Sequence, residues 1–260
     1  MRSTIIAAAA LVLLLVLAAS APAQGATISA ALQPNTANSG STLHVGVSGA
    51  APELAGVVPE SLTLGLQRGF AVDLVAFSKR CDPNHASIGD CPAASRIGGG
   101  HALVHASGLL TADVSAGLVM FLAEPIEAKD LASVVMRVDV GSRSRALRAR
   151  LVAPAGGPFG YELRIVGVAA TLPTIPGVVL SLRSLVLDLG ARRTVTKIVR
   201  KRTRVTRKGK RVTVTRTVKR KVRRNLMRNP TTCAGSWGVR VTIRIAGSDR
   251  IRDLATPCSA

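Results

Sequence analysis

Aromatic residues are scarce in this chain: four Phe, one Tyr and one Trp occur among 260 residues. Hydrophobic residues nevertheless make up 47% of the sequence, so any core must be aliphatic, and global disorder is excluded. The scarcity argues against sugar binding on aromatic platforms. Residues 192–228, the most basic part of the chain, contain no aromatic residue. Sequence-specific or single-stranded nucleic acid recognition, which relies on stacking, is therefore not expected.

Short catalytic motifs are also missing. The chain has no G-x-S-x-G elbow, no H-E-x-x-H zinc motif and no phosphate-binding glycine loop. The run IGGGHA (97–102) lacks a βαβ context, and we interpret it as a strand entry or a bulge. We interpret His101 and His105 as strand histidines and 81–91 as a turn closed by a disulfide. We expect no catalytic residue, no metal site and no cofactor; an enzyme with a loop-built site is an alternative.

The only long apolar run lies at the start of the chain. Arg2 precedes an apolar stretch at 5–19, and small residues follow it, which is the layout of a secretory signal peptide. A spanning helix needs roughly 20 apolar residues, so an uncleaved anchor is the weaker interpretation. We predict a signal peptide at 1–23, cleaved after Ala23, with cleavage after Ala21 as runner-up. Residues 24–260 would then form one exported domain without a membrane span.

Cysteines are few, and all lie in the part predicted to be exported. An even number in an oxidising compartment predicts disulfides. Of the three possible pairings, Cys81–Cys91 with Cys233–Cys258 closes the most local loops and is favoured, while the other two stay open. Together with the signal peptide, the cysteines predict a secreted or cell-envelope protein.

Strand patterns recur along the whole chain. Leu62, Leu64 and Leu66 alternate with small or polar residues, and 239–245 alternates apolar residues with Arg and Thr. Turn clusters rich in Gly, Pro, Asn and Asp separate about a dozen such runs. The sequence therefore predicts an all-β fold, a β-sandwich or an open barrel. The segment 124–133 is the one candidate for a helical turn.

The positive charge is concentrated in one segment. Residues 192–228 contain 18 Lys or Arg and no Asp or Glu, so they carry +18 of the formal +21. This segment is also rich in Val and Thr, unlike a disordered polycation. If it folds about 208–209, residues whose numbers sum to 417 face each other, and valines meet valines at 205/212, 199/218 and 195/222. A register shifted by one residue is the alternative, because Lys-Gly is a weaker turn signal than Asn-Gly. We predict a β-hairpin whose arms have about 14 residues and a length of roughly 45 Å, so that part of the ribbon projects from the domain.

The hairpin is the one candidate binding site. Lys and Arg on a projecting ribbon neutralise phosphates with an affinity that falls steeply with salt. The expected partners are nonspecific polyanions: wall phosphate polymers, acidic polysaccharide, anionic lipid headgroups or extracellular DNA. The residues expected to contact them are Arg200, Arg202, Arg204, Arg207, Lys208, Lys210, Arg211, Lys219 and Lys221. The alternative is a structural or protein-binding module with a merely solvated basic ribbon, whose charge guards its strand edges.

Four short motifs occur in order: PESLTLGLQRGFAVDL (59–74), CPAASRIGGG (91–100), NPTTCAGSW (229–237) and TPC (256–258). In this order they resemble a group of uncharacterised, exported, β-rich proteins of actinobacteria. That group pairs a C…CPxxSxIG segment with a C-terminal NPxTCxGxW…C motif. The resemblance implies an exported bacterial β-domain with two disulfides, and it implies no activity. The basic hairpin looks like a region in which such proteins vary in length and charge.

Overall fold

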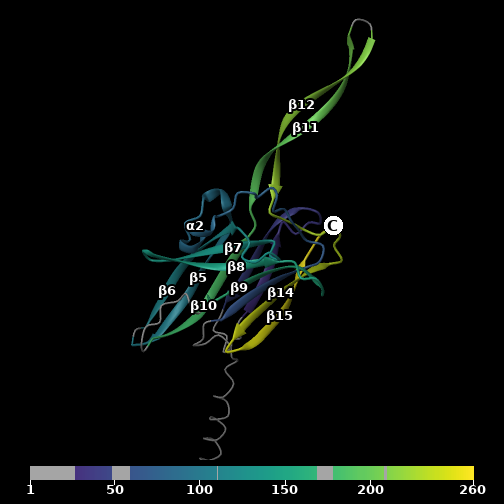
Figure 1. The fold of residues 1–260 in the computed structure, drawn as a ribbon. Coiled ribbons are helices and arrows are strands. Elements are labelled where there is room, and N and C mark those ends of the chain that lie inside the picture. The colour runs from purple at the N-terminus through teal and green to yellow at the C-terminus, as the bar shows by residue number, and fades with distance from the viewer. Residues whose placement is uncertain (1–26, 49–58, 110, 169–177, 208–209) are drawn as a thin grey trace, which may run out of the picture.

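The fold is described by a computed structural model for residues 27–48, 59–109, 111–168, 178–207 and 210–260. The predicted signal peptide and its cleavage site lie outside these residues. Antiparallel strands dominate the described chain (Figure 1), which confirms the predicted all-β class. No helix among the described residues is long and apolar enough to cross a membrane.

Fifteen strands occur within the described residues. Thirteen form one antiparallel sheet, the body of the domain, and two form a separate ribbon. The body strands are β1 (Thr27–Gln33), β2 (Gly40–Ser48), β3 (Ser61–Gln67), β4 (Ala71–Val72), β5 (Arg96–Gly108), β6 (Ala112–Ala123), β7 (Ala132–Val140), β8 (Arg143–Val152), β9 (Phe159–Val166), β10 (Val178–Leu189), β13 (Met227–Arg228), β14 (Ser236–Ile245) and β15 (Ser248–Pro257). The ribbon consists of β11 (Arg192–Arg207) and β12 (Lys210–Asn225).

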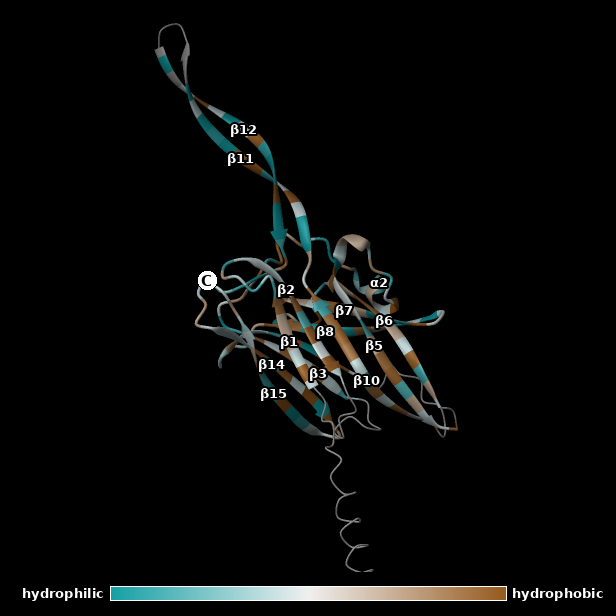
Figure 2. Cartoon of the chain, turned by 180° about the vertical axis from the view of Figure 1, so that it is seen from behind, coloured by the Kyte–Doolittle hydropathy of each residue, from teal (hydrophilic) through white to brown (hydrophobic). Residues whose placement is uncertain are grey.

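The body sheet curls until its two ends meet. Its strands are ordered β15-β14-β3-β9-β8-β7-β6-β5-β10-β2-β13-β4, and β1 also pairs with β2. The edge strands β1 and β15 contact each other, and the Thr256 hydroxyl donates a hydrogen bond to the Ala30 carbonyl at 3.5 Å. This arrangement, called the barrel from here on, is consistent with both expected forms, a β-sandwich and an open barrel. Figure 2 shows one of its walls, in which β1, β2, β10, β5 and β6 lie side by side.

Alternation along the strands fills the barrel. On β14, Val239, Val241 and Ile243 are buried, whereas Arg240, which lies between them, and Arg244, which follows them, point outward. The same pattern on β2 buries every second residue. The alternation arises because side chains of successive strand residues point to opposite faces. The interior is almost wholly aliphatic because the chain contains few aromatic residues.

The glycine run at 97–102 serves strand packing. At Gly98 a Cβ atom would lie 2.2 Å from the Asp188 carbonyl oxygen, and at Gly100 it would lie 2.0 Å from that of Val186. The pairing of β5 with β6 shifts register between Arg96 and Gly98. The interpretation as a bulge at a strand entry is therefore confirmed, and the glycines allow β10 to approach β5 closely.

Both disulfides have the favoured pairing, Cys81–Cys91 and Cys233–Cys258. The first closes a loop that carries a helix, α2 (Pro83–Ile88), over a small apolar cluster on the outer side of β6 and β7. The second connects the loop before β14 to the residue that follows β15. Each disulfide thus holds a loop against the barrel.

The helix α2 lies where the sequence analysis expected only a turn. Asp82 caps it, since its carboxylate accepts hydrogen bonds from the N–H groups of Asn84 and His85 at 2.8 and 3.4 Å. Pro83 occupies the first helical position, and Gly89 ends the helix at a φ of 74°. These are ordinary start and stop signals. The segment 124–133, the expected helical candidate, forms a single turn.

The NPTTC motif forms a structural joint. Asn229 is 1% exposed, and its side-chain oxygen accepts a hydrogen bond from the Ser41 hydroxyl at 2.5 Å. Its amide nitrogen donates to the carbonyls of Pro34 and Thr36, at 2.9 Å each. One buried side chain therefore holds together the chain leaving the ribbon, the start of β2 and the turn after β1.

Replacing Asn229 with Ala should destabilise the fold by about 2–4 kcal/mol, because several buried polar groups lose their partner. Urea unfolding measures this cost. The control is Asn84→Ala on the exposed side of α2, which should change stability by less than about 0.5 kcal/mol. Equal unfolding midpoints for the two variants would show that the joint contributes nothing to stability.

Replacing Gly100 with Ala should cost about 1–3 kcal/mol or more, because the new Cβ meets a backbone carbonyl that a side-chain movement does not relieve. Gly156→Ala is the matched control, since no atom lies within 4 Å of a Cβ there. Thermal unfolding followed by circular dichroism compares them. A Gly100→Ala melting temperature at or above that of the control would contradict the close strand approach.

Candidate polyanion-binding ribbon

The basic segment forms the predicted hairpin, in the predicted register. β11 and β12 have 16 residues each and pair along their whole length. The expected valine pairs 205/212, 199/218 and 195/222 all occur. Figure 1 shows the two strands leaving one end of the barrel and projecting away from it as a twisted ribbon.

Contacts at its base attach the ribbon to the barrel. The Arg193 guanidinium lies 4.7 Å from the centre of the buried Phe77 ring, and this burial lowers the pKa of Arg193. Arg224 forms an ion pair with Asp73 at 3.6 Å. Beyond Asn225 the chain enters the core, and Leu226 is 5% exposed. These contacts fix the position from which the ribbon emerges.

The two faces of the ribbon arrange their cations differently. On the staggered face every cation beyond the Arg192–Asn225 pair at the base lies opposite a Thr or an Ile of the other strand. These cations are Arg200, Arg202 and Arg204 on β11 and Arg211, Lys219, Lys221 and Arg223 on β12. Along β11 they follow one another at every second residue, a spacing of about 6.8 Å. The staggered face thus avoids direct like-charge pairing.

The paired face has the opposite arrangement. Lys197 lies opposite Arg220 and Lys201 opposite Arg216, and two further like-charge pairs occur at the ends of the same face, Arg193–Arg224 and Arg207–Lys210. The valine pair between the two central rows is partly open to solvent, with Val199 38% and Val218 46% exposed. Like charges directly opposite each other destabilise a strand pair. An anion bound between them would remove that repulsion.

The structure places the nine predicted contact residues as follows. Arg200, Arg202, Arg204, Arg211, Lys219 and Lys221 share the staggered face. Arg207 and Lys210 form the last pair of the ladder next to the turn, and Lys208 lies outside the described residues. The residues predicted from the sequence do not include Arg223 or the four cations of the two central pairs, Lys197–Arg220 and Lys201–Arg216. The register sum of 417 already brings these four together, so the signal to find them was present.

Eleven cations of the two faces are exposed and unneutralised: the seven named on the staggered face and the four of the two central pairs on the paired face. Among the residues that the structure describes, the ribbon forms one ion pair, that of Arg224 at its base. The rest of the ribbon charge is therefore available to an anionic partner.

Other candidate sites in the body are weaker. His105 lies on β5 with its Nδ1 2.6 Å from Asp113 Oδ1 on β6, and His44 and Asp188 form a similar pair at 2.6 Å. Within the described part of the chain, no group of three or more His, Cys, Asp or Glu is arranged to hold a metal ion. The histidines thus serve as cross-strand partners of aspartates.

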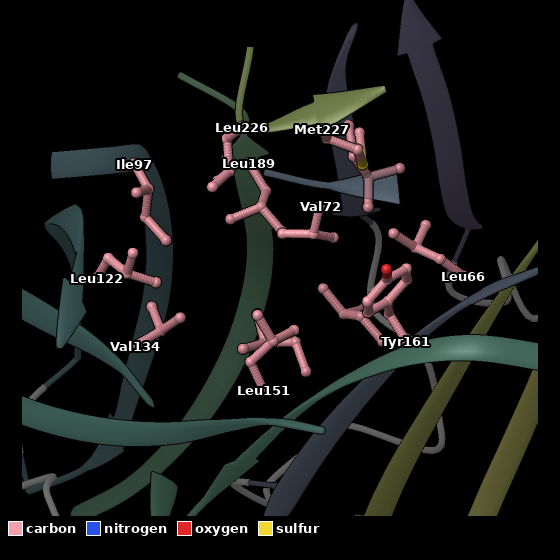
Figure 3. Close-up of a pocket in the computed structure, with 13 residues that line it drawn as sticks. Leu66, Val72, Ile97, Leu122, Val134, Leu151, Tyr161, Leu189, Leu226 and Met227 are labelled. Atoms are coloured by element: carbon pink, nitrogen blue, oxygen red, sulfur yellow. The ribbon is translucent and has the colours of Figure 1, made fainter. Parts of the chain in front are cut away.

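An apolar cavity of about 40 Å³ lies inside the barrel, where Val72, Leu122, Leu151 and Leu226 converge (Figure 3). Tyr161 supplies the one hydroxyl in its lining. A dry cavity that binds benzene measures about 150 Å³. The barrel cavity is therefore too small for a metabolite of ordinary size.

Comparison with known proteins leaves the ribbon as the principal evidence. No family model, curated protein or solved structure matches this chain. The functional argument therefore depends on the geometry and charge of the molecule itself.

Replacing Lys201 with Glu should stabilise the ribbon by about 0.2–1 kcal/mol, because the new carboxylate faces Arg216 across the strands. Hydrogen exchange of the Thr203 and Val214 amides should slow, and high salt should reduce the difference. Lys201→Gln, which only removes the repulsion, should give a smaller effect. If Glu accelerates exchange, the two residues are not opposite each other in solution.

Proposed function

We propose that this protein is an exported, non-enzymatic protein that binds linear anionic polymers of the cell envelope through its ribbon. One observation carries the proposal: eleven exposed cations on a projecting ribbon, without an acidic residue between Arg192 and Arg228. The two disulfides are compatible with an extracytoplasmic protein. Export itself is supported by the apolar start of the sequence.

The charge distribution favours a polymer over a compact ligand. The staggered face presents charge in a line along each strand, and beyond the foot of the ribbon no pocket is found among its described residues. Binding by such a track neutralises successive phosphates and releases their counterions. A phosphate polymer of the cell wall is the partner with which we would test it first.

The proposal predicts how steeply the affinity falls as the salt concentration rises. For a single-chain polyanion the slope of log affinity against log salt is about −0.7 per phosphate neutralised. If about six phosphates are engaged, the affinity should fall roughly 300-fold between about 50 and 200 mM salt. A binding mode based on buried apolar contacts would be almost insensitive over this range.

The test compares two full-length triple variants that lose the same charge. The ribbon variant replaces Arg200, Arg202 and Arg204 with Thr, which keeps strand propensity. We expect its slope against a wall phosphate polymer to be shallower by about 2, since three phosphate contacts are removed. Isothermal titration at several salt concentrations measures the slope.

The control variant replaces three exposed arginines of the body with Thr: Arg143, Arg145 and Arg250. Its slope should stay within about 0.3 of that of the unchanged protein, because these residues do not line the track. Equal losses in the two variants would assign binding to overall charge. If the unchanged protein fails to bind at low salt, the ribbon is a solvated structural feature, and protein partners become the next candidates.

A further inference from the structure

A groove of about 780 Å³ lies at the foot of the ribbon, where it joins the barrel. Its walls come from the short turn η1 (Ala93–Ser95), the start of β5, the end of β10 and the first residues of β11. The three glycines 98–100 form its floor and leave it without side chains there. The groove is thus continuous with the base of the basic ribbon.

Three arginines line this groove: Arg193, whose guanidinium packs on Phe77, and Arg96 and Arg192, whose guanidinium groups are oriented by hydrogen bonds. Arg96 Nε donates to the Gly98 carbonyl at 3.4 Å, and Arg192 Nε donates to Asn225 Oδ1 at 3.1 Å. A Cβ atom on Gly99 would lie 3.4 Å from Arg96 Nη2, so this guanidinium rests against the glycine floor. In both residues the orienting bond uses Nε, which leaves the terminal NH₂ groups for a ligand.

The charge of the groove is unbalanced. Neither Arg96 nor Arg192 forms an ion pair within the described ranges of the chain. The carboxylate in the lining, that of Asp188, has its Oδ1 2.6 Å from Nδ1 of His44. Thr194 adds an exposed hydroxyl at the rim. The groove therefore presents two oriented cations and a hydroxyl donor to whatever enters it.

We propose that this groove is a second anion site, which binds one phosphoryl group between Arg96 and Arg192. Guanidinium forks bind carboxylate and phosphate oxygens in pairs. A carboxylate offers two oxygens that lie in one plane, whereas a phosphoryl group offers three terminal oxygens in different directions, enough for two forks and a hydroxyl. The phosphoryl group thus fits the donor set best.

The source of this group rests on the proposed function. If the ribbon binds a phosphate polymer, the polymer continues from the ribbon onto the barrel and places an end group or a backbone phosphate in the groove. A free phosphate compound offers the same chemistry without the ribbon. The experiment therefore uses inorganic pyrophosphate as a compact probe and poly(glycerol phosphate) as a polymer.

Two full-length double variants separate the groove from the ribbon, and each loses two positive charges. Arg96→Gln with Arg192→Gln alters the groove, and Arg202→Gln with Arg204→Gln alters the staggered face. We expect the groove variant to lose about tenfold or more in affinity for pyrophosphate at low salt, because charge-assisted hydrogen bonds are lost. The ribbon variant should stay within about twofold of the unchanged protein. Arg96→Gln alone serves as a second groove variant that leaves the Arg192–Asn225 bond in place.

Equal pyrophosphate affinity in all of these proteins would overturn the groove site, even if the polymer binds the ribbon normally. Conversely, a protein that ignores the polymer but loses pyrophosphate binding with Arg96→Gln retains the groove site while the proposed function fails. If the groove variant loses more polymer affinity than the ribbon variant, the polymer reaches the groove. Unchanged polymer affinity together with lost pyrophosphate binding would overturn the polymer as the source and assign the groove to a free phosphate compound.

Discussion

Like-charge repulsion is the constraint around which the ribbon is organised. A pair of strands without a hydrophobic core is only marginally stable in isolation, and here both faces of the pair also carry cations. The base supplies what the ribbon itself lacks: Leu226 and Met227 are buried in the barrel, and Arg193 packs on Phe77. Contacts between its base and the barrel thus stabilise the ribbon, while most of its charged side chains remain in solvent.

The barrel itself explains why its sequence motifs carry no visible chemistry. Trp237 packs edge-on against Phe70 with ring centroids 5.8 Å apart, and its indole N–H donates to the Thr232 carbonyl at 3.0 Å. Asn229 binds three neighbouring segments through its buried amide. The residues that stand out in the sequence are therefore those that close the barrel and hold its loops. Side chains available to a partner lie in the ribbon and at its foot.

Much of the fold was predictable because it depends on local periodicity. Alternating apolar residues located β3 and β14, and the matched valines gave the ribbon its correct register. The signals for α2 were also local, in Asp82, Pro83 and Gly89, but the loop was interpreted only as a turn. The sheet order, by contrast, pairs β3 with β9 and β14, far apart in the chain. No local pattern specifies such pairings.

The candidate site divides in the same way. The residues on each face of the ribbon can be predicted from its register, because paired residues have numbers that sum to 417. The groove cannot, because its lining combines Arg96 from the start of β5 with Arg192 from the start of β11. Their placement in one groove depends on the pairing of β5 with β10, and that pairing is possible because of the close backbone contact at Gly98 and Gly100.

The length of the ribbon has a consequence for how the protein senses its surroundings. Sixteen residues per strand correspond to about 50 Å, whereas the electrostatic screening length at physiological ionic strength is about 8 Å. The far end of β11 and β12 therefore lies several screening lengths from the barrel, so its charge acts independently of the charge on the barrel. Under the proposed function, a polymer would meet that end first and the foot of the ribbon only later.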